Sequence, residues 1–140
     1  MIEYINEITV EDYNELRASV GWKVLNHDLA KRGLDGSAFI TVAYDTVAKS
    51  PVAMGRVITD GGYMALIVDV MVAPEYQGRG IGAQLIKNMN KYFEEITSNG
   101  NTLMVNLMAT KDKEGFYEKL GYTVRPNESM GAGLCKWYNN

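Results

Sequence analysis

The chain has 140 residues and a formal net charge of −3 at pH 7. Hydrophobic residues make up 46% of it and charged residues 22%, which are ordinary values for a folded domain and argue against disorder. A mildly acidic chain offers little attraction to a nucleic acid or to an anionic membrane. We therefore expect a single domain over residues 1–140, long enough to bury a core, with no nucleic-acid and no membrane partner.

Two further features bear on the compartment. No apolar run approaches the roughly 18 residues of a membrane span, and the first residues, Met1–Tyr4, lack the basic and apolar stretches of an export signal. Cys135 is the single cysteine, so no disulfide forms within the chain. These observations predict a cytoplasmic protein in a reducing environment.

The first half of the chain predicts two helices followed by a strand meander. Thr9, with Asp12 in the next turn, is typical of a helix cap. Asp60-Gly61-Gly62 between two runs of β-forming residues predicts a hairpin. The predicted elements are a strand at 2–5, helices at 9–20 and 22–32, and strands at 37–44, 51–59 and 63–72.

The second half predicts alternating strands and helices. The strand at 63–72 is apolar on both faces except at Asp69, as expected of a central strand covered on each side. The later elements are a helix at 81–98, a strand at 102–108, a helix at 112–120, and strands at 122–125 and 133–138. This order predicts an α/β (α+β) fold in which a mixed central sheet of six to seven strands is flanked by about four helices.

Residues 69–83 contain the most informative motif of the chain. A run of β-formers ends at Pro74, glycines follow at positions 78, 80 and 82, and a helical pattern begins at Ile81. The first N–H groups of a helix have no partner within the helix, and their dipoles favour an anion. Glycines allow a ligand to approach those groups closely. The motif therefore predicts a phosphate-binding site.

Two common phosphate sites fit this motif poorly. A P-loop requires Gly-Lys-Ser/Thr after the glycines, and no such residues follow. Residues 78–83 do fit the dinucleotide pattern G-x-G-x-x-G/A, but that pattern follows its strand directly and has a carboxylate about 20 residues later. Here residues 73–77 intervene, and residues 103–106 contain no carboxylate. A nicotinamide-dependent oxidoreductase is therefore disfavoured.

The motif instead resembles that of the GCN5-related N-acetyltransferases, the GNAT family. Gln77-Gly78-Arg79-Gly80-Ile81-Gly82 matches the signature Gln/Arg-x-x-Gly-x-Gly/Ala, and residues 116–122, Phe-Tyr-Glu-Lys-Leu-Gly-Tyr, are similar to a second family segment. The resemblance covers residues 39–125. It implies a mostly antiparallel sheet with a splay between the strand at 63–72 and the next strand. It also implies direct transfer of an acetyl group from acetyl-CoA, without a metal, to a primary amine of a small molecule or peptide in a ternary complex.

The resemblance also implies which residues bind and react. It places the acetyl-CoA arm and pyrophosphate on Val70, Met71, Val72, Gln77, Gly78, Arg79, Gly80, Ile81, Gly82 and Ala83. Tyr117 matches the family tyrosine that protonates the leaving sulfur; the alternative is a tyrosine that only packs between helix and sheet. An acyl-CoA-binding sensor of the same fold, without turnover, is the alternative function.

The general base is less well defined. Asp69 is the only ionisable residue of its strand, which makes it a candidate base, but a buried aspartate bonded to neighbouring backbone is an equal alternative. Some family members carry a glutamate earlier in this strand, where Leu66 stands here. A relay of ordered waters, with no protein base, is also open.

The sequence has no recognisable signature for the acceptor amine. The Tyr- and Trp-containing C-terminal segment leaves a homodimer open.

Overall fold

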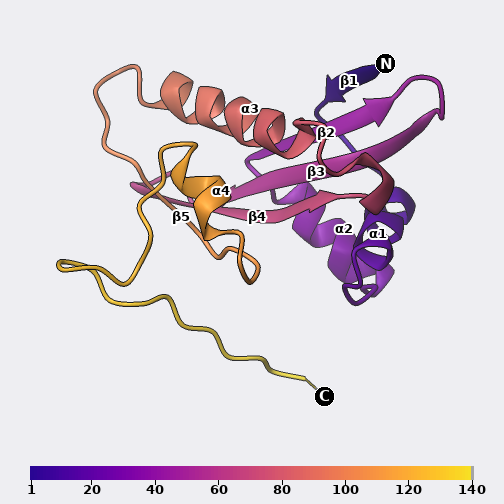
Figure 1. Ribbon diagram of the computed structural model, residues 1–140. Coiled ribbons are helices and arrows are strands. Elements are labelled where there is room, and N and C mark those ends of the chain that lie inside the picture. Colours follow the sequence, from indigo (N-terminus) through magenta and orange to yellow (C-terminus); the bar gives the residue numbers. More distant parts are fainter. Residues whose placement is uncertain (140) are drawn as a thin grey trace. The chain divides into compact units, whose positions relative to one another are not determined.

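The computed structural model describes residues 1–139, and its strands form one five-stranded sheet in the order β1-β2-β3-β4-β5 (Figure 1). Neighbouring strands from β1 to β4 are antiparallel, whereas β4 and β5 are parallel. The sheet is therefore mixed and mostly antiparallel. The strands are β1 (Ile2–Ile5), β2 (Phe39–Asp45), β3 (Ser50–Thr59), β4 (Met64–Val72) and β5 (Met104–Leu107).

The chain divides into two compact units, and the prediction of a single domain over residues 1–140 stays a prediction. The first unit, Met1–Leu107, contains the sheet, and the second begins at Met108. The first unit also contains α1 (Val10–Ser19), α2 (His27–Asp35), the 3₁₀ turn η1 (Pro74–Tyr76) and α3 (Ile81–Ile96). The second contains α4 (Glu114–Glu118). Across the described part of the chain, no helix has the length and apolarity needed to cross a membrane.

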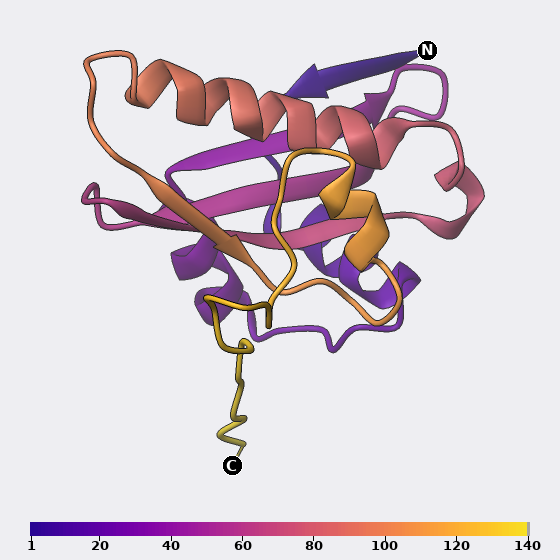
Figure 2. The same ribbon diagram turned by 60° about the vertical axis from the view of Figure 1, so that its left-hand side comes forward.

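Within the first unit, helices cover both faces of the sheet (Figure 2). On one face, Tyr13 and Leu16 of α1 pack in a buried cluster with Met54 of β3 and Met71 of β4. On the other face, α3 buries an apolar side that includes the fully buried Met89. The central strands are thus shielded from water on both sides, as the apolar sequence of β4 predicts.

The first helix follows the sequence prediction, whereas the second is displaced. The Thr9 hydroxyl accepts the N–H of Asp12 at 3.1 Å and caps α1. Residues 22–32 were expected to form the second helix, but α2 covers His27–Asp35 because Asn26 caps it by accepting the N–H groups of Asp28 and Leu29. Residues 20–26 are instead a connection between the two helices.

The expectation of six to seven strands is wrong for the described residues, which form five. The strands expected at 122–125 and 133–138 are absent from residues 1–139. The first is followed by Pro126, which has no N–H for a ladder, and by a turn in which the Asn127 side chain accepts the N–H groups of Ser129 and Met130. The second begins at Gly133, just after Gly131, and glycine loses much conformational entropy in a strand.

The second unit contains a shorter helix than the 112–120 segment expected. α4 covers Glu114–Glu118, and Gly121 follows with φ of +98°. The ring of Tyr117 contacts Phe116 and Tyr122 edge-on, with centroids 5.0 and 6.4 Å apart. Aromatic side chains therefore fix Tyr117 within this unit.

Candidate functional site

β4 bulges opposite Gly55 of β3. The pairing between the two strands shifts between Met54 and Arg56, so that Asp69 and Val70 both lie opposite this single glycine. Asp69 has φ of +54°, in the left-handed region that few residues other than glycine adopt. β4 is therefore distorted at the one ionisable residue of its length.

The bulge turns the backbone groups of Val70 away from β3. The N–H of Ala73 donates to the Val52 carbonyl of β3 at 2.8 Å, whereas the Tyr63 carbonyl accepts from Met104 at the start of β5. Because backbone groups alternate along a strand, the residues just before and just after the bulge both face β3. Between them, the Asp69 N–H and the Val70 carbonyl point to the opposite edge, and the left-handed conformation of Asp69 turns the Val70 N–H to that edge as well.

That opposite edge of β4 is open within the first unit. β5 pairs with β4 only as far as Ile67, which lies opposite Leu107. Beyond this point Val70 and Val72 direct their backbone groups toward a gap where β5 no longer runs alongside. The Val72 carbonyl accepts from the Gln77 amide at 2.9 Å. A strand edge with no neighbouring strand can accept an extended ligand as an added strand.

The glycine opposite the bulge allows the close packing of α3. A Cβ at position 55 would lie 2.8 Å from Cε of Met89 and 3.6 Å from Cγ2 of Val70. The first distance is shorter than real side chains allow, so Gly55 lets α3 and the bulge approach β3 together.

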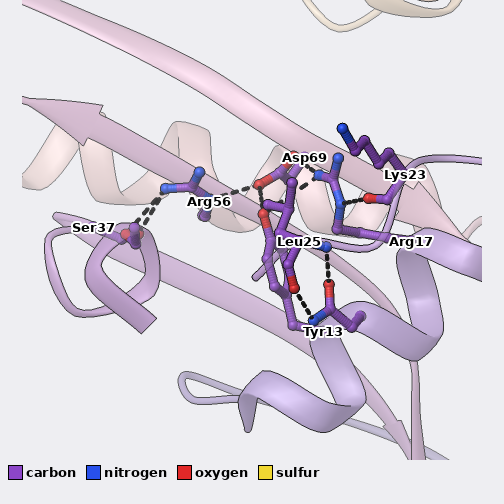
Figure 3. A network of polar contacts seen from close by, with 9 residues as sticks. Tyr13, Arg17, Lys23, Leu25, Ser37, Arg56 and Asp69 are labelled. Carbon is purple, nitrogen blue, oxygen red and sulfur yellow. Dashed lines mark hydrogen bonds and ion pairs between the residues drawn. The ribbon is translucent and has the colours of Figure 1, made fainter. Parts of the chain in front are cut away.

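The Asp69 side chain is bound by three partners, and we call Tyr13, Arg17, Arg56 and Asp69 the Asp69 cluster (Figure 3). Asp69 Oδ2 accepts from Arg56 Nε at 2.7 Å and from the Tyr13 hydroxyl at 2.6 Å. Asp69 Oδ1 accepts from Arg17 Nη1 at 3.2 Å. The three charged side chains are only 12–13% exposed. The cluster thus joins α1, β3 and β4 through one nearly buried carboxylate.

The two arginines of the Asp69 cluster are also bonded to α2 and to nearby loops. Arg17 Nε donates to the Lys23 carbonyl at 2.7 Å, and Arg56 Nη1 donates to the Gly33 carbonyl and the Ser37 hydroxyl at 3.2 and 3.1 Å. Burial, followed by the hydrogen bond to Asp69, raises the pKa of Tyr13. The Tyr13 phenol therefore remains a donor near neutral pH.

The N-terminus of α3 is built without capping side chains. Gly80 is its N-cap with φ of +79°, and Gly78 has φ of +78°. No side chain caps this helix, and its first turn contains no acidic residue. A Cβ at position 78 or 80 would meet no heavy atom within 4 Å, so the approach to this turn is open. The phosphate loop, as we call residues 77–83, therefore offers backbone donors to an anion.

The side chains of the phosphate loop are occupied elsewhere. Arg79 donates to the Glu75 carbonyl at 2.9 Å, and its guanidinium lies over the Tyr76 ring, 4.8 Å from the centroid. The Tyr76 hydroxyl donates to the Asp45 carboxylate at the end of β2. That bond and those from two backbone N–H groups lower the pKa of Asp45 to about 2.

A surface cavity of about 460 Å³ lies at another part of the first unit. It adjoins the Asp69 cluster through Ser37, which bonds to Arg56, and through Ile40, which pairs with Arg56 across β2 and β3. Its lining residues are Asn6, Glu7, Ile8, Leu34, Asp35, Ser37, Ala38, Phe39 and Ile40. No residue of the bulge or of the phosphate loop lines it.

Comparison with known proteins identifies the class. A family model described as an acetyltransferase (GNAT) domain matches residues 36–124. The chain belongs to the GNAT family of acetyltransferases.

Among particular relatives, the chain is 30% identical to protein SA2161 of meticillin-resistant Staphylococcus aureus, a probable acetyltransferase, with a TM-score of 0.82 over 99% of this chain and 100% of that one. It is 27% identical to the uncharacterized N-acetyltransferase ycf52 of Gracilaria tenuistipitata var. liui, over 98% of this chain and 72% of the relative. It is 29% identical to the chloroplastic serotonin N-acetyltransferase 2 of Oryza sativa subsp. japonica, over 88% of this chain and 60% of the relative.

The structure brings together most of the residues singled out in the sequence. Val70, Met71 and Val72 lie at the bulge and along β4, and residues 77–83 form the phosphate loop. Tyr117 lies in the second unit, on α4. Residues 1–139 contain no cluster of His, Cys, Asp or Glu suited to a metal ion.

Sequence reasoning missed the partners of Asp69. Tyr13 and Arg17 are spaced one helical turn apart on the face of α1 that also carries the buried Leu16. Arg56 is the one charged residue in β3. A charge next to an apolar helix face, and a charge inside an apolar strand, were the available signals that these residues meet a buried counter-charge.

Proposed function

We propose that this protein is an acetyl-CoA-dependent N-acetyltransferase that transfers the acetyl group directly to a primary amine of a small molecule or peptide in a ternary complex. One observation carries the proposal: the open edge of β4 begins at a bulge and leads toward an uncapped helix N-terminus lined by glycines. An acyl-CoA has a thioester, an extended arm with amide groups, and a pyrophosphate, and these three parts match those three features in order.

The cofactor contacts follow from this match. The pantetheine amides would pair with the backbone groups of Val70 and Val72 as an added strand. The pyrophosphate would accept hydrogen bonds from the N–H groups of residues 78–82, with Gln77 and Ala83 at the ends of the loop. A charge at a helix N-terminus gains roughly 0.3–1 kcal/mol when exposed and up to about 2 kcal/mol when partly buried. For Arg79 we propose a contact through its backbone N–H, because its guanidinium is occupied.

The reaction requires stabilisation of an oxyanion. The unprotonated amine attacks the thioester carbonyl carbon, the carbonyl oxygen becomes negative, and the C–S bond then breaks as coenzyme A leaves. The alternation along β4 favours the N–H of Val70 over that of Met71 as the donor to this oxyanion, because Met71 faces β3. A single donor of this kind has been worth about 3–4 kcal/mol in other acyl transfers.

Tyr117 is the proposed acid that protonates the leaving sulfur. Burial raises the pKa of Tyr117, so the phenol carries its proton at neutral pH. A Tyr117→Phe variant is expected to lower kcat by about 100-fold or more if this proton transfer matters. Thiol release at saturating acetyl-CoA measures the change, and an unaltered kcat would leave Tyr117 a packing residue only.

The proton of the attacking amine is assigned to a water relay. Asp69 was a candidate base, but its two oxygens accept from Tyr13, Arg17 and Arg56. Because both oxygens are engaged by donors from α1 and β3 and the side chain is only 12% exposed, the carboxylate is not placed to accept a proton from a substrate amine. The single cysteine continues to support a reducing cytoplasm as the location.

Ligand binding and amine acetylation test the proposal together. Acetyl-CoA at about a hundredfold over its Kd adds about 2.7 kcal/mol of stability, whereas NAD is expected to add none. The amine panel for thiol release includes serotonin, because one relative carries that substrate in its name. Binding of acetyl-CoA without acetylation of any amine would favour the sensor function instead.

A matched pair of variants locates the pyrophosphate. Gly80→Glu places a carboxylate in the phosphate loop, whereas Gly100→Glu places one just past the far end of α3, at a glycine that also has positive φ and open space. Both are expected to lose similar stability. Only Gly80→Glu should abolish the thermal shift with acetyl-CoA, and equal shifts in the two variants would contradict the site.

A further inference from the structure

We infer that Asp69 is a positioning residue: held by Tyr13, Arg17 and Arg56, it fixes the bulge of β4 so that the N–H of Val70 stays directed at the open edge. This inference rests on the proposed function for its catalytic consequence. The support of the bulge by Asp69 involves only residues of the first unit and does not depend on that function.

The bulge needs support from outside β4. A non-glycine residue in the left-handed region is strained, and such conformations persist only where the surrounding structure determines them. Asp69 has φ of +54° and lies in a strand whose neighbours on both sides are β-forming. Without the partners of Asp69, the free energy of the fold would be lowered if β4 straightened or shifted its register with β3, because either change relieves the strained conformation of Asp69.

The contacts of Asp69 hold the bulge from one face. Its two oxygens are bound by donors from α1 and from β3, over distances of 2.6–3.2 Å. Since donors from two directions engage both oxygens, the carboxylate can neither rotate nor retreat without losing a charge-assisted bond. The Cα of Asp69, and with it the peptide unit shared with Val70, is fixed by the same contacts.

The opposite face holds the bulge by packing. Val70 lies across Gly55, on the side of the sheet covered by Met89 of α3. The polar cluster on one face and the close approach of α3 on the other therefore clamp two successive residues of β4. A donor held in this way meets a developing oxyanion without first having to reorganise, which is the condition for large stabilisation.

A base role and a positioning role for Asp69 predict different patterns of kinetics. Tyr13→Phe leaves the carboxylate in place and removes one of its bonds, so a base would keep its activity whereas a positioning residue would lose part of it. Asp69→Asn keeps an acceptor oxygen and tolerates positive φ, and Asp69→Gly keeps the backbone conformation accessible but removes every contact. Positioning therefore predicts a graded loss, and a base predicts equal loss in the two Asp69 variants.

The expected changes in kcat are about 10-fold for Tyr13→Phe and about 100-fold for Asp69→Gly, with Asp69→Asn in between. The KM for acetyl-CoA should change by less than about twofold, because the phosphate loop is untouched. The pH profile of kcat/KM should keep its shape in all three variants. The control is Thr41→Val, which removes a buried hydrogen bond to Asn88 between β2 and α3 and leaves the Asp69 cluster intact.

Amide hydrogen exchange tests the positioning in protein that need not turn over. The N–H groups of Val68 and Met71 flank the bulge and face β3. When Asp69→Gly and Thr41→Val are compared at the same distance below their Tm, these two groups should exchange at least about tenfold faster in Asp69→Gly. Unchanged exchange at these two amides would overturn the inference, as would loss of the acidic limb of the pH profile in Asp69→Asn. An inactive wild type would overturn the proposed function, and the exchange rates would still decide whether Asp69 fixes the bulge.

Discussion

The two halves of the proposed site in the first unit are built by different means. The phosphate loop is formed by local backbone: Gly78 and Gly80 take up positive φ, and no side chain caps α3. The bulge of β4 is held by side chains, because Asp69 binds residues that lie 13 to 56 positions away in the sequence. Changes at the bulge should therefore reduce stability and turnover, and changes at the loop should reduce cofactor binding.

Removal of one arginine from the Asp69 cluster is expected to have the largest effect on stability. Arg56→Met keeps the aliphatic volume but removes the bonds to Asp69, Gly33 and Ser37. We expect the free energy of unfolding to fall by about 2–4 kcal/mol, because a nearly buried carboxylate loses one of its two counter-charges. Urea denaturation measures this change.

A surface pair provides the control for that variant. Lys31→Met also replaces a cation by methionine and breaks an ion pair, that with Asp35, but both side chains are more than half exposed. Water replaces the lost partner there, so the urea midpoint should hardly move. If the two variants unfold at the same urea concentration, the Asp69 cluster does not support the fold as described.

A smaller loss is expected at the glycine opposite the bulge. Gly55→Ala places a Cβ 2.8 Å from the flexible end of Met89, which must shift to make room. We expect a loss of about 1–3 kcal/mol from overpacking. Because Cγ2 of Val70 lies 3.6 Å from the same Cβ, kcat should fall as well.

Another glycine tests whether that loss comes from packing. Gly115 lies in α4, and a Cβ there would meet no atom within 4 Å. Gly115→Ala should therefore be neutral or stabilise by up to about 1 kcal/mol, because alanine favours helix. If the packing around Gly55 is as described, thermal unfolding should show a lower Tm for Gly55→Ala and an unchanged or higher Tm for Gly115→Ala. Equal losses of Tm would contradict it.

This difference in construction also decides what the sequence could reveal. The glycine turn and the start of α3 could be predicted, because glycine spacing and a helix start are local signals. The hairpin at residues 60–62 and the cap at Thr9 were local in the same way, and both are present. The bulge could not be predicted, because it depends on where Arg56 and Tyr13 lie in space.

The errors have the same origin. The second helix was expected at 22–32, but the cap at Asn26 and the contact of Arg17 with Lys23 set the end of the preceding connection. The strands expected after residue 121 had suitable β-forming residues, yet a strand forms only where a neighbouring edge accepts it. Asp69 was recognised as unusual from its strand, but its role follows from partners on two other elements.

The smallest effect is expected where a side chain supports the phosphate loop. Tyr76 donates to Asp45 and stacks under Arg79, so Tyr76→Phe keeps the ring and removes only the hydrogen bond. That bond is the largest cause of the low pKa of Asp45, about 2 in place of 3.8. The variant should bring this pKa back toward its ordinary value.

The sign of the pH effect follows from linkage. A carboxyl group whose pKa is lowered by folding stabilises the fold above its unfolded pKa, and this contribution is lost as the pH falls through the folded value. The difference in Tm between wild type and Tyr76→Phe should therefore be full at pH 6 and shrink between pH 3.8 and about 2. A difference that stays constant down to pH 2 would mean that the Tyr76 hydroxyl does not act through Asp45. Since the backbone of the loop is unchanged, affinity for acetyl-CoA at pH 7 should be almost unaltered, in contrast to Gly80→Glu.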